Sequence, residues 1–225
     1  MSAMPAIKGF LETSFIDWPG CLCSVVFLGG CNFRCPFCHN HPLVLAPQSF
    51  ATIPLDHVLK RLGEMRPWLG GVCVTGGEPT LAPDLAELLR TFKAAGVPVK
   101  LDTNGTRPAV LEQLLAEGLV AMVAMDVKAP LDQAKYDTCT GVGVDLAAIR
   151  QSIECIKSSG LPHQFRMTVL PRLHTEADIR AWRDTLAGSP LKLQNFNPQS
   201  PLDGEFAKEK GFAPDVFARL QALVA

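Results

Sequence analysis

Short apolar runs alternate with helical patterns along most of this chain. The runs that predict β-strands cover residues 23–29, 71–76, 97–103, 120–127, 163–170 and 191–197. Amphipathic helices are predicted over residues 55–65, 81–95, 108–118, 145–158, 175–187 and 214–224. Repeated β/α units form parallel sheets with right-handed crossovers. We therefore predict an α/β fold, a partial (β/α)6 TIM-like barrel with parallel strands, built as a single domain over residues 1–225.

Polar motifs follow the ends of these predicted strands. They are the cysteine loop at 31–38, GGEP at 76–79, DTNG at 102–105, DVK at 126–128 and NFNP at 195–198. In parallel barrels the active site lies at the carboxyl ends of the strands. We expect these motifs to share one end of the sheet.

Composition excludes several classes of protein. Hydrophobic residues make up 48% and charged residues 19% of the chain, which is enough to form a core. The net charge of −1 gives no electrostatic footprint for nucleic acid or an anionic membrane, and we expect neither as a partner. No apolar stretch reaches the roughly 18 residues of a membrane span. The first residues also lack the apolar segment of a signal peptide, so we expect a cytoplasmic protein.

Three of the eight cysteines, Cys31, Cys35 and Cys38, have the spacing Cys-x3-Cys-x2-Cys. Iron–sulfur clusters are normally held by four cysteines. A set of three leaves one iron without a protein ligand, which favours chemistry at that iron. Zinc is the alternative, with His39 or His41 as a fourth ligand, although structural zinc sites usually pair two Cys/His knuckles and no second knuckle occurs here.

The segment CNFRCPFCHN resembles the cluster loop of the radical S-adenosylmethionine (SAM) superfamily, with Phe37 at the aromatic position before the third cysteine. The resemblance implies a [4Fe–4S] cluster on the three cysteines, whose open iron binds the amino and carboxylate groups of SAM. It also implies that one electron cleaves SAM to methionine and a 5′-deoxyadenosyl radical. Phe37 and His39, on either side of Cys38, are assigned to the cofactor site.

The GGEP motif suits a ligand that carries an ammonium group. Two glycines let the backbone approach a ligand closely, and a neighbouring carboxylate accepts hydrogen bonds from an ammonium group. By resemblance to the superfamily, Gly76, Gly77 and Glu78 bind the amino group of SAM. The alternative is a plain turn before a helix.

The segments LDTNG and MDVK resemble those of enzymes that activate glycyl radical proteins. The resemblance implies that Asp102 and Asp126 lie near SAM and a monovalent cation, and that Lys128 contacts SAM. The alternative is that Asp102 begins an Asx turn and that Lys128 is a solvated side chain.

Two further residues are candidates for SAM contacts. Arg166 lies between apolar neighbours in a predicted strand, so it needs an anion. That anion is either the SAM carboxylate or an internal Asp or Glu. Related activating enzymes often have a His near residue 197 that contacts the adenosine of SAM, and Asn197 occupies that place here.

The segment FIDWPG at 15–20 resembles the DGPG segment of glycyl radical activating enzymes, with Trp18 in place of a glycine. In those enzymes the region faces the protein substrate, which implies that Asp17 and Trp18 contact a partner here. The alternative is a simple turn into the first predicted strand.

The resemblance extends from Ile7 to about Pro198 and is closest to the activating proteins of anaerobic ribonucleoside-triphosphate reductase. It implies abstraction of a hydrogen atom from a backbone glycine of a large glycyl radical enzyme, with reduced flavodoxin or ferredoxin as the electron donor. One alternative is a radical SAM enzyme that acts on a small molecule, such as a carboxy-deazaguanine synthase. The other is a non-catalytic iron–sulfur or zinc-binding module.

Overall fold

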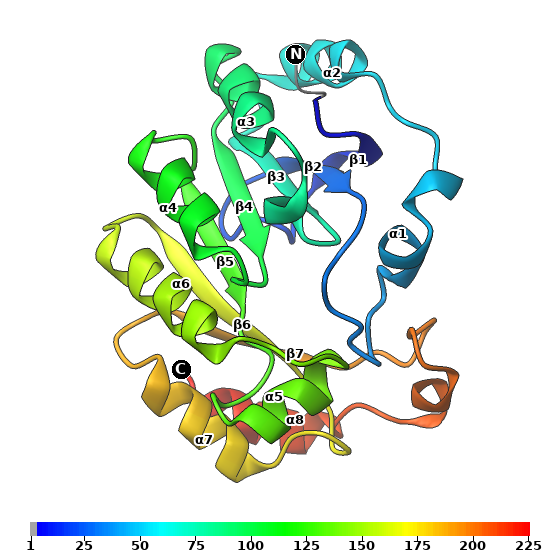
Figure 1. Ribbon diagram of the computed structural model, residues 1–225, viewed down its shortest axis with the longest axis vertical. Helices are drawn as coiled ribbons and strands as arrows, with labels where there is room; N and C mark the ends of the chain where they lie inside the picture. The colour runs from blue at the N-terminus through cyan, green and yellow to red at the C-terminus, as the bar shows by residue number, and fades with distance from the viewer. Residues whose placement is uncertain (1–3) are drawn as a thin grey trace. The chain divides into compact units, whose positions relative to one another are not determined.

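The computed structural model describes residues 4–225 and divides them into two units that interleave along the chain. The first unit holds the residues up to Asn32, Pro42–Thr103 and Ala109–Val123. The second holds Phe33–His41, Asn104–Pro108 and Ala124–Ala225. Figure 1 labels the elements of both in chain order.

The first unit is built on four strands: β1 (Ile7–Ser14), β2 (Cys23–Leu28), β3 (Gly71–Gly76) and β4 (Val99–Thr103). β2, β3 and β4 run parallel and side by side (Figure 1). Their residues are almost all buried, as expected for a parallel sheet covered on both faces. β1 pairs antiparallel with β2, so its start lies beside the end of β2.

Helices cover these strands where the sequence places an apolar stripe. The helical elements between β2 and β5 are α1 (His41–Leu45), η1 (Pro47–Ser49), α2 (Leu55–Met65), η2 (Pro79–Leu81), α3 (Leu85–Ala94) and α4 (Pro108–Ala116). On α3 the buried residues are Leu85, Leu88, Leu89 and Phe92, which share one face of a helix. This buried face is the one that the periodicity predicts.

The second unit contains the end of β5 (Met122–Asp126), then β6 (His163–Val169) and β7 (Leu191–Asn195), and β6 and β7 pair in parallel. Its helical elements are α5 (Gln133–Thr140), α6 (Leu146–Ser158), α7 (Glu176–Thr185), η3 (Gly204–Lys208) and α8 (Pro214–Ala222). Local capping fixes where two of these helices begin. The Asp145 side chain accepts the backbone N–H groups of Ala147 and Ala148 at α6, and Thr175 forms a capping box with Asp178 at α7.

The strands follow the order β1 to β7 in a seven-stranded sheet, in which β1 and β2 pair antiparallel while β2–β3, β3–β4 and β6–β7 pair in parallel. The predicted α/β fold and partial barrel are confirmed, and each of the six predicted strands is present. The single-domain organisation stays a prediction. In the part of the chain that the structure describes, no helix combines the length and apolar character needed to cross a bilayer.

Candidate active site

The cysteine loop begins directly after β2, and its second half is fixed by backbone hydrogen bonds within the second unit. The N–H of Arg34 donates to the carbonyl of Thr140 (2.8 Å), and the N–H of Asp203 donates to the carbonyl of Pro36 (3.0 Å). The N–H of Cys38 donates to the carbonyl of Cys35 (3.0 Å), which closes a turn between these two cysteines. Cys35 is buried and Cys38 is half-buried. The loop therefore holds its side chains in a defined turn.

Positive charge lies beside these two thiols. Burial raises the pKa of Cys38, and the Lys128 ammonium opposes that rise. Burial would lower the pKa of Lys128, but Asp126 and Cys35 outweigh it and hold that pKa above its ordinary value. No disulfide joins any of the chain's cysteines, all of which lie in the described region. Three reduced thiols in one loop, two of them next to a cation that favours thiolates, fit an iron–sulfur cluster.

Asp126, the last residue of β5, and Lys128 meet Arg166 in the middle of β6. The Lys128 ammonium lies 3.0 Å from Asp126 Oδ2, and Arg166 Nε lies 2.8 Å from Oδ1. Burial would raise the pKa of Asp126, but the two cations outweigh it and hold that pKa well below its usual range. The Asp126 carboxylate thus faces two cations. The pairing gives Arg166 an internal acid as partner, and its contact with SAM stays a prediction.

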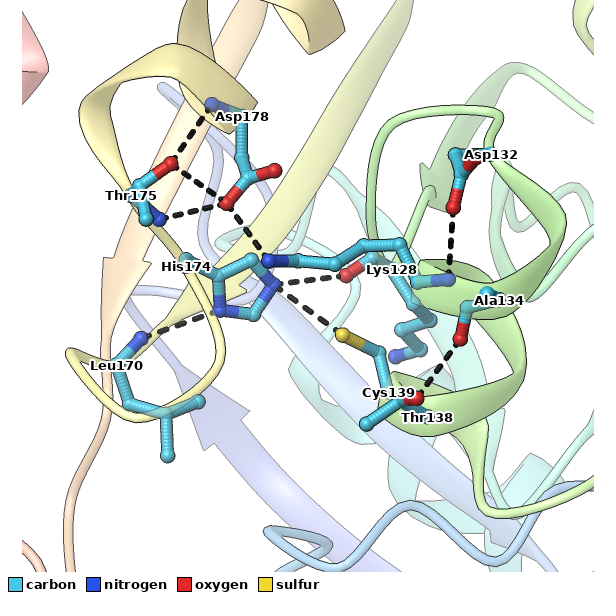
Figure 2. Close-up of polar contacts among 10 residues, drawn as sticks. Lys128, Asp132, Ala134, Thr138, Cys139, Leu170, His174, Thr175 and Asp178 are labelled. Carbon is cyan, nitrogen blue, oxygen red and sulfur yellow. Dashed lines mark hydrogen bonds and ion pairs between the residues drawn. The ribbon is translucent and has the colours of Figure 1, made fainter.

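The backbone of Lys128 is held by two buried side chains that sequence reasoning missed. His174 Nε2 donates to the Lys128 carbonyl (3.0 Å), and the N–H of Leu170 donates to His174 Nδ1 (3.4 Å), as Figure 2 shows. On the other side of the residue, the N–H of Lys128 donates to Tyr136 Oη (3.4 Å). Both peptide groups of Lys128 are therefore anchored. The position of His174, a polar residue shortly after the predicted strand 163–170, could have indicated its role in the sequence.

The imidazole of His174 is neutral in this arrangement. Its Nδ1 accepts a hydrogen bond while its Nε2 donates one, so a single proton lies on Nε2. Burial lowers the pKa of His174, against the opposing effect of its bond to the Lys128 carbonyl. Cys139 Sγ lies 3.6 Å from Nε2 (Figure 2), and burial raises the pKa of Cys139 to about 11. This contact is therefore one between two neutral groups.

His39 and Asn197, two predicted SAM residues, lie together in the second unit. His39 Nε2 donates to the Asn197 carbonyl (2.5 Å), and the imidazole stacks on Phe196. The Asn197 side chain accepts the N–H of Gln199 (3.1 Å), so it also stabilises a local turn. Within residues 4–225, no three His, Cys, Asp or Glu side chains gather closely enough to bind a single metal ion.

The GGEP motif is joined to the segment that leads into Cys31. The N–H of Gly77 donates to the Leu28 carbonyl (2.9 Å), and the N–H of Glu78 donates to the Gly30 carbonyl (2.8 Å). A Cβ on Gly77 would overlap the Gly30 carbonyl, so this approach of two backbones requires glycine. The predicted amino-group site therefore adjoins the beginning of the cysteine loop.

Glu78 itself is buried and oriented by hydroxyl groups. Its Oε1 accepts the N–H of Thr80 (3.0 Å), the Thr80 hydroxyl and the Thr103 hydroxyl (2.8 Å). A carboxylate with several donors on one oxygen keeps its orientation. Thr103 thus supports Glu78, while the neighbouring Asp102 pairs with Lys100, which the sequence did not single out.

Asp17 and Trp18 lie in the turn between β1 and β2. This turn precedes β2, whereas Cys31 follows it, so a six-residue strand of about 20 Å separates the two features. The Ser14 hydroxyl donates to Asp17 (2.5 Å), and Trp18 packs on a buried cluster of Cys23, Val25 and Cys73. Their contact with a partner stays a prediction.

A family model described as the Radical SAM superfamily matches residues 25–185. A protein of Methanocaldococcus jannaschii, provisionally named a glycyl-radical enzyme activating enzyme, is 34% identical over 90% of this chain and 84% of that protein. The pyruvate formate-lyase-activating enzyme of Clostridium pasteurianum is 28% identical over 76% of this chain and 71% of its own length. The GTP 3′,8-cyclase of Stenotrophomonas maltophilia is 30% identical over 78% of this chain and 54% of its own length.

Solved structures agree with the fold. SuiB of Streptococcus suis bound to S-adenosylmethionine superposes with a TM-score of 0.68 at 17% identity, over 87% of this chain and 44% of SuiB. TYW1 with a lysine–pyruvate adduct gives a TM-score of 0.61 at 16% identity, over 89% of this chain and 72% of that chain. The matched family model covers most of the chain and includes the cysteine loop, GGEP, Asp126 and Arg166. The chain therefore belongs to the radical SAM superfamily, whose members use a [4Fe–4S] cluster and S-adenosylmethionine.

Proposed function

We propose that this protein is an activating enzyme for a glycyl radical enzyme, with an anaerobic ribonucleotide reductase as the expected partner. The observation that carries the proposal is the 34% identity to the M. jannaschii relative, which extends over most of both chains. The match to a pyruvate formate-lyase-activating enzyme supports the same class. In this proposal the partner supplies the substrate, a backbone glycine.

In this proposal the three cysteines of the loop bind the cluster, and the cluster and SAM together supply the radical chemistry. Cys31, Cys35 and Cys38 hold the cluster, which when bound supplies the electron that cleaves SAM to methionine and a 5′-deoxyadenosyl group with one unpaired electron. That group takes one hydrogen atom from the glycine Cα. The products are 5′-deoxyadenosine and a glycyl radical, so atoms and electrons balance.

The chain's own charged groups would orient SAM. Glu78 suits the SAM ammonium group because it is a buried carboxylate whose orientation is fixed by two threonines. Lys128 and Arg166 suit the SAM carboxylate because both are cations and Asp126 holds them close together. The aromatic Phe37, together with His39 and Asn197, is proposed to line the same site.

The electron donor and partner surface are also proposals. Reduced flavodoxin or ferredoxin is expected to supply the electron, in the cytoplasm. Asp17 and Trp18 are expected to contact the partner. Phe15 and Ile16 in the same turn are about 80% exposed, which suits a surface that another protein covers.

The test uses the full chain with its cluster reconstituted under anaerobic conditions. With SAM and a reductant it should release 5′-deoxyadenosine, and with the right reductase it should give a glycine-centred signal in electron paramagnetic resonance. Cys35→Ala should lose the cluster and both activities, whereas Cys155→Ala, on α6, should keep them. Absence of SAM cleavage by a fully loaded cluster would contradict the proposal.

A small molecule is the second candidate for the substrate. The GTP 3′,8-cyclase relative supports it, although that match spans only 54% of the cyclase. A carboxy-deazaguanine synthase belongs to this same alternative. Consumption of a purine or pterin derivative with SAM cleavage, and without any protein partner, would favour this candidate over the activating enzyme.

A further inference from the structure

A lysine side chain is buried in the first unit's sheet. Lys100 is the second residue of β4, and its side chain is 1% exposed. Asp102 is two residues further along the strand, so both side chains project from the same face. The Lys100 ammonium forms an ion pair with Asp102 and lies 3.5 Å from Cys73 Sγ on β3.

Lys100 lies beside a small buried cluster. Cys73 is the direct neighbour of Lys100 in the register of β3 and β4. Cys73 also packs with Cys23 and Val25, and Trp18 covers this cluster. A buried ammonium in such a place is stable only with a counter-charge and hydrogen-bond acceptors. Asp102 supplies that negative charge.

The same ion pair bears on the monovalent cation that the resemblance to activating enzymes implies. Such a cation would need the Asp102 carboxylate as a ligand. That carboxylate already carries a protein cation on Oδ1, and a metal ion beside it would add a second positive charge to a buried site. The residues around Asp102 therefore do not fit a monovalent metal ion.

We propose that the Lys100 ammonium replaces the monovalent cation and that this protein binds no alkali-metal ion at Asp102. Lys100 is then a positioning residue: it holds the Asp102 carboxylate in a fixed orientation whatever salt is present. The link from Asp102 to SAM rests on the proposed function, whereas the absence of a metal ion at Asp102 does not.

The first test compares salts at constant ionic strength. The reconstituted full-length protein is measured in sodium, potassium and tetramethylammonium chloride, since tetramethylammonium is too large to occupy a buried cation site. We expect the wild-type unfolding midpoint and SAM affinity to be the same in all three salts. A specific, saturable stabilisation of the wild type by sodium or potassium that Asp102→Asn abolishes would overturn the inference.

The second test removes the ammonium. In Lys100→Met the buried Asp102 carboxylate loses its counter-charge, so we expect SAM affinity in tetramethylammonium to fall by about tenfold or more. Potassium or sodium should then restore much of the affinity and raise the unfolding midpoint by several degrees, because an ion that binds only the folded state stabilises it. A folded Lys100→Met protein without any preference among the salts would also overturn the inference.

Two controls separate this role from general effects of charge. Lys100→Met/Asp102→Asn removes both charges and should lose the salt preference that the single variant gains. Lys60→Met changes an exposed lysine on α2 in the same unit and should behave like the wild type.

Binding of thallium(I), followed by its NMR signal, gives a readout without SAM: Lys100→Met should bind it and the wild type should not. If Lys100→Met does not fold, the wild-type salt and thallium measurements still decide the question.

Discussion

At the scale of single residues, Lys128 is held through its backbone as well as through its side chain. Tyr136 and His174 fix its two peptide groups, and Asp126 fixes its ammonium. A long side chain normally loses considerable rotamer entropy when it binds a ligand. Anchoring at both ends reduces that loss, and this suits a residue that must present one charge beside Cys38.

Replacement of Lys128 by methionine should separate SAM binding from cluster assembly. The change removes the ammonium but keeps most of the side-chain volume, so we expect SAM affinity to fall by about tenfold or more. Iron and sulfide content should stay at the wild-type level because the cysteines are unchanged. Equilibrium binding of SAM under anaerobic conditions measures the effect.

Lys135→Met is the matched control for that change. Lys135 lies seven residues later and pairs with Asp178 on α7. SAM affinity should stay close to the wild-type value in this variant. Equal losses in the two variants would contradict a direct role for Lys128.

His174 should make stability fall in mild acid. Its pKa in the folded protein is lowered by burial, while in the unfolded chain it titrates near pH 6.5. The unfolded chain therefore binds the proton first as the pH falls, so stability is complete above about pH 6.5 and decreases from there toward the lower folded pKa. Lys135 adds to the lowering, and Asp178 and the Lys128 carbonyl oppose it.

His174→Gln tests this dependence because an amide can donate to the Lys128 carbonyl and accept from Leu170 without titrating. Urea unfolding at pH 7.5 and at pH 5.5 should show a smaller loss of stability in the variant than in the wild type. His57→Gln, at an exposed site on α2, should leave the difference unchanged. An unaltered pH dependence in His174→Gln would show that other groups cause it.

Sequence reasoning could propose roles for residues that lie in short motifs, but it missed residues whose contacts come from distant parts of the chain. The cysteine loop, GGEP and DVK were recognisable because each places several groups within a few residues. His174, Tyr136 and Lys100 gain their roles from contacts across the fold, for example the 46 residues between His174 and Lys128. The internal partner of Arg166 was one of two alternatives, and only the geometry identified Asp126.

At the scale of elements, the junction of β2 and β3 depends on backbone contact. GGEP follows β3 and hydrogen-bonds to the end of β2, just before the cysteine loop. Gly76 adopts φ 124°, which is open only to glycine, and the carbonyl of Gly30 lies where a Cβ of Gly77 would be. The two strand ends can approach only because both positions lack side chains.

Gly77→Ala should therefore disturb both stability and cofactor binding. The new methyl group would force GGEP away from Gly30, and we expect a loss of about 2 kcal/mol or more in the free energy of unfolding. Cluster content should fall as the neighbouring loop shifts. Chemical denaturation and iron analysis measure the two effects.

Gly63→Ala is the control for that substitution, with the opposite expectation. Gly63 lies on the exposed side of α2, and no atom comes within 4 Å of the place its Cβ would take. Alanine should stabilise the helix there by about 0.5–1 kcal/mol and leave the cluster intact. Comparable destabilisation by both changes would indicate a general intolerance of alanine rather than the specific backbone approach.

The elements that sequence reasoning missed lack a periodic pattern. α5 buries Tyr136, Cys139 and Thr140. Its sequence QAKYDTCT has no apolar stripe, so its burial depends on the segments packed against it and could not be predicted from periodicity. β1 is half-exposed and mixes Lys, Gly and Glu with apolar residues, so its alternation is weak. α3 begins at Leu85 rather than residue 81 because η2 occupies the preceding residues.

At the scale of the whole molecule, the alternation of strands and helices was sufficient to predict the fold. A parallel sheet requires buried strands and long crossovers, and both leave a strong pattern in the sequence. The division into two interleaved units left no such pattern in the sequence. The chain changes from one unit to the other within the cysteine loop and near residue 104, and neither place is marked by a linker. The prediction of one domain therefore needs an experiment.

Calorimetry of the protein without its cluster provides that experiment. A single domain predicts one transition, with equal calorimetric and van't Hoff enthalpies of unfolding. Two resolved transitions would show that the units unfold separately and would contradict the one-domain prediction. A repeat at a second scan rate checks that the transition is reversible.

β1 has a consequence for how this protein behaves in concentrated solution. As the first strand of the sheet it covers the hydrogen-bonding edge of β2, and it carries charged Lys8 and Glu12, which bond to Phe50 and Arg61 respectively. An uncovered parallel strand is a template for pairing with other molecules. β1 therefore protects β2 from pairing with strands of other molecules. Removal of the N-terminal residues through Ser14 would expose this edge of β2 and should promote aggregation.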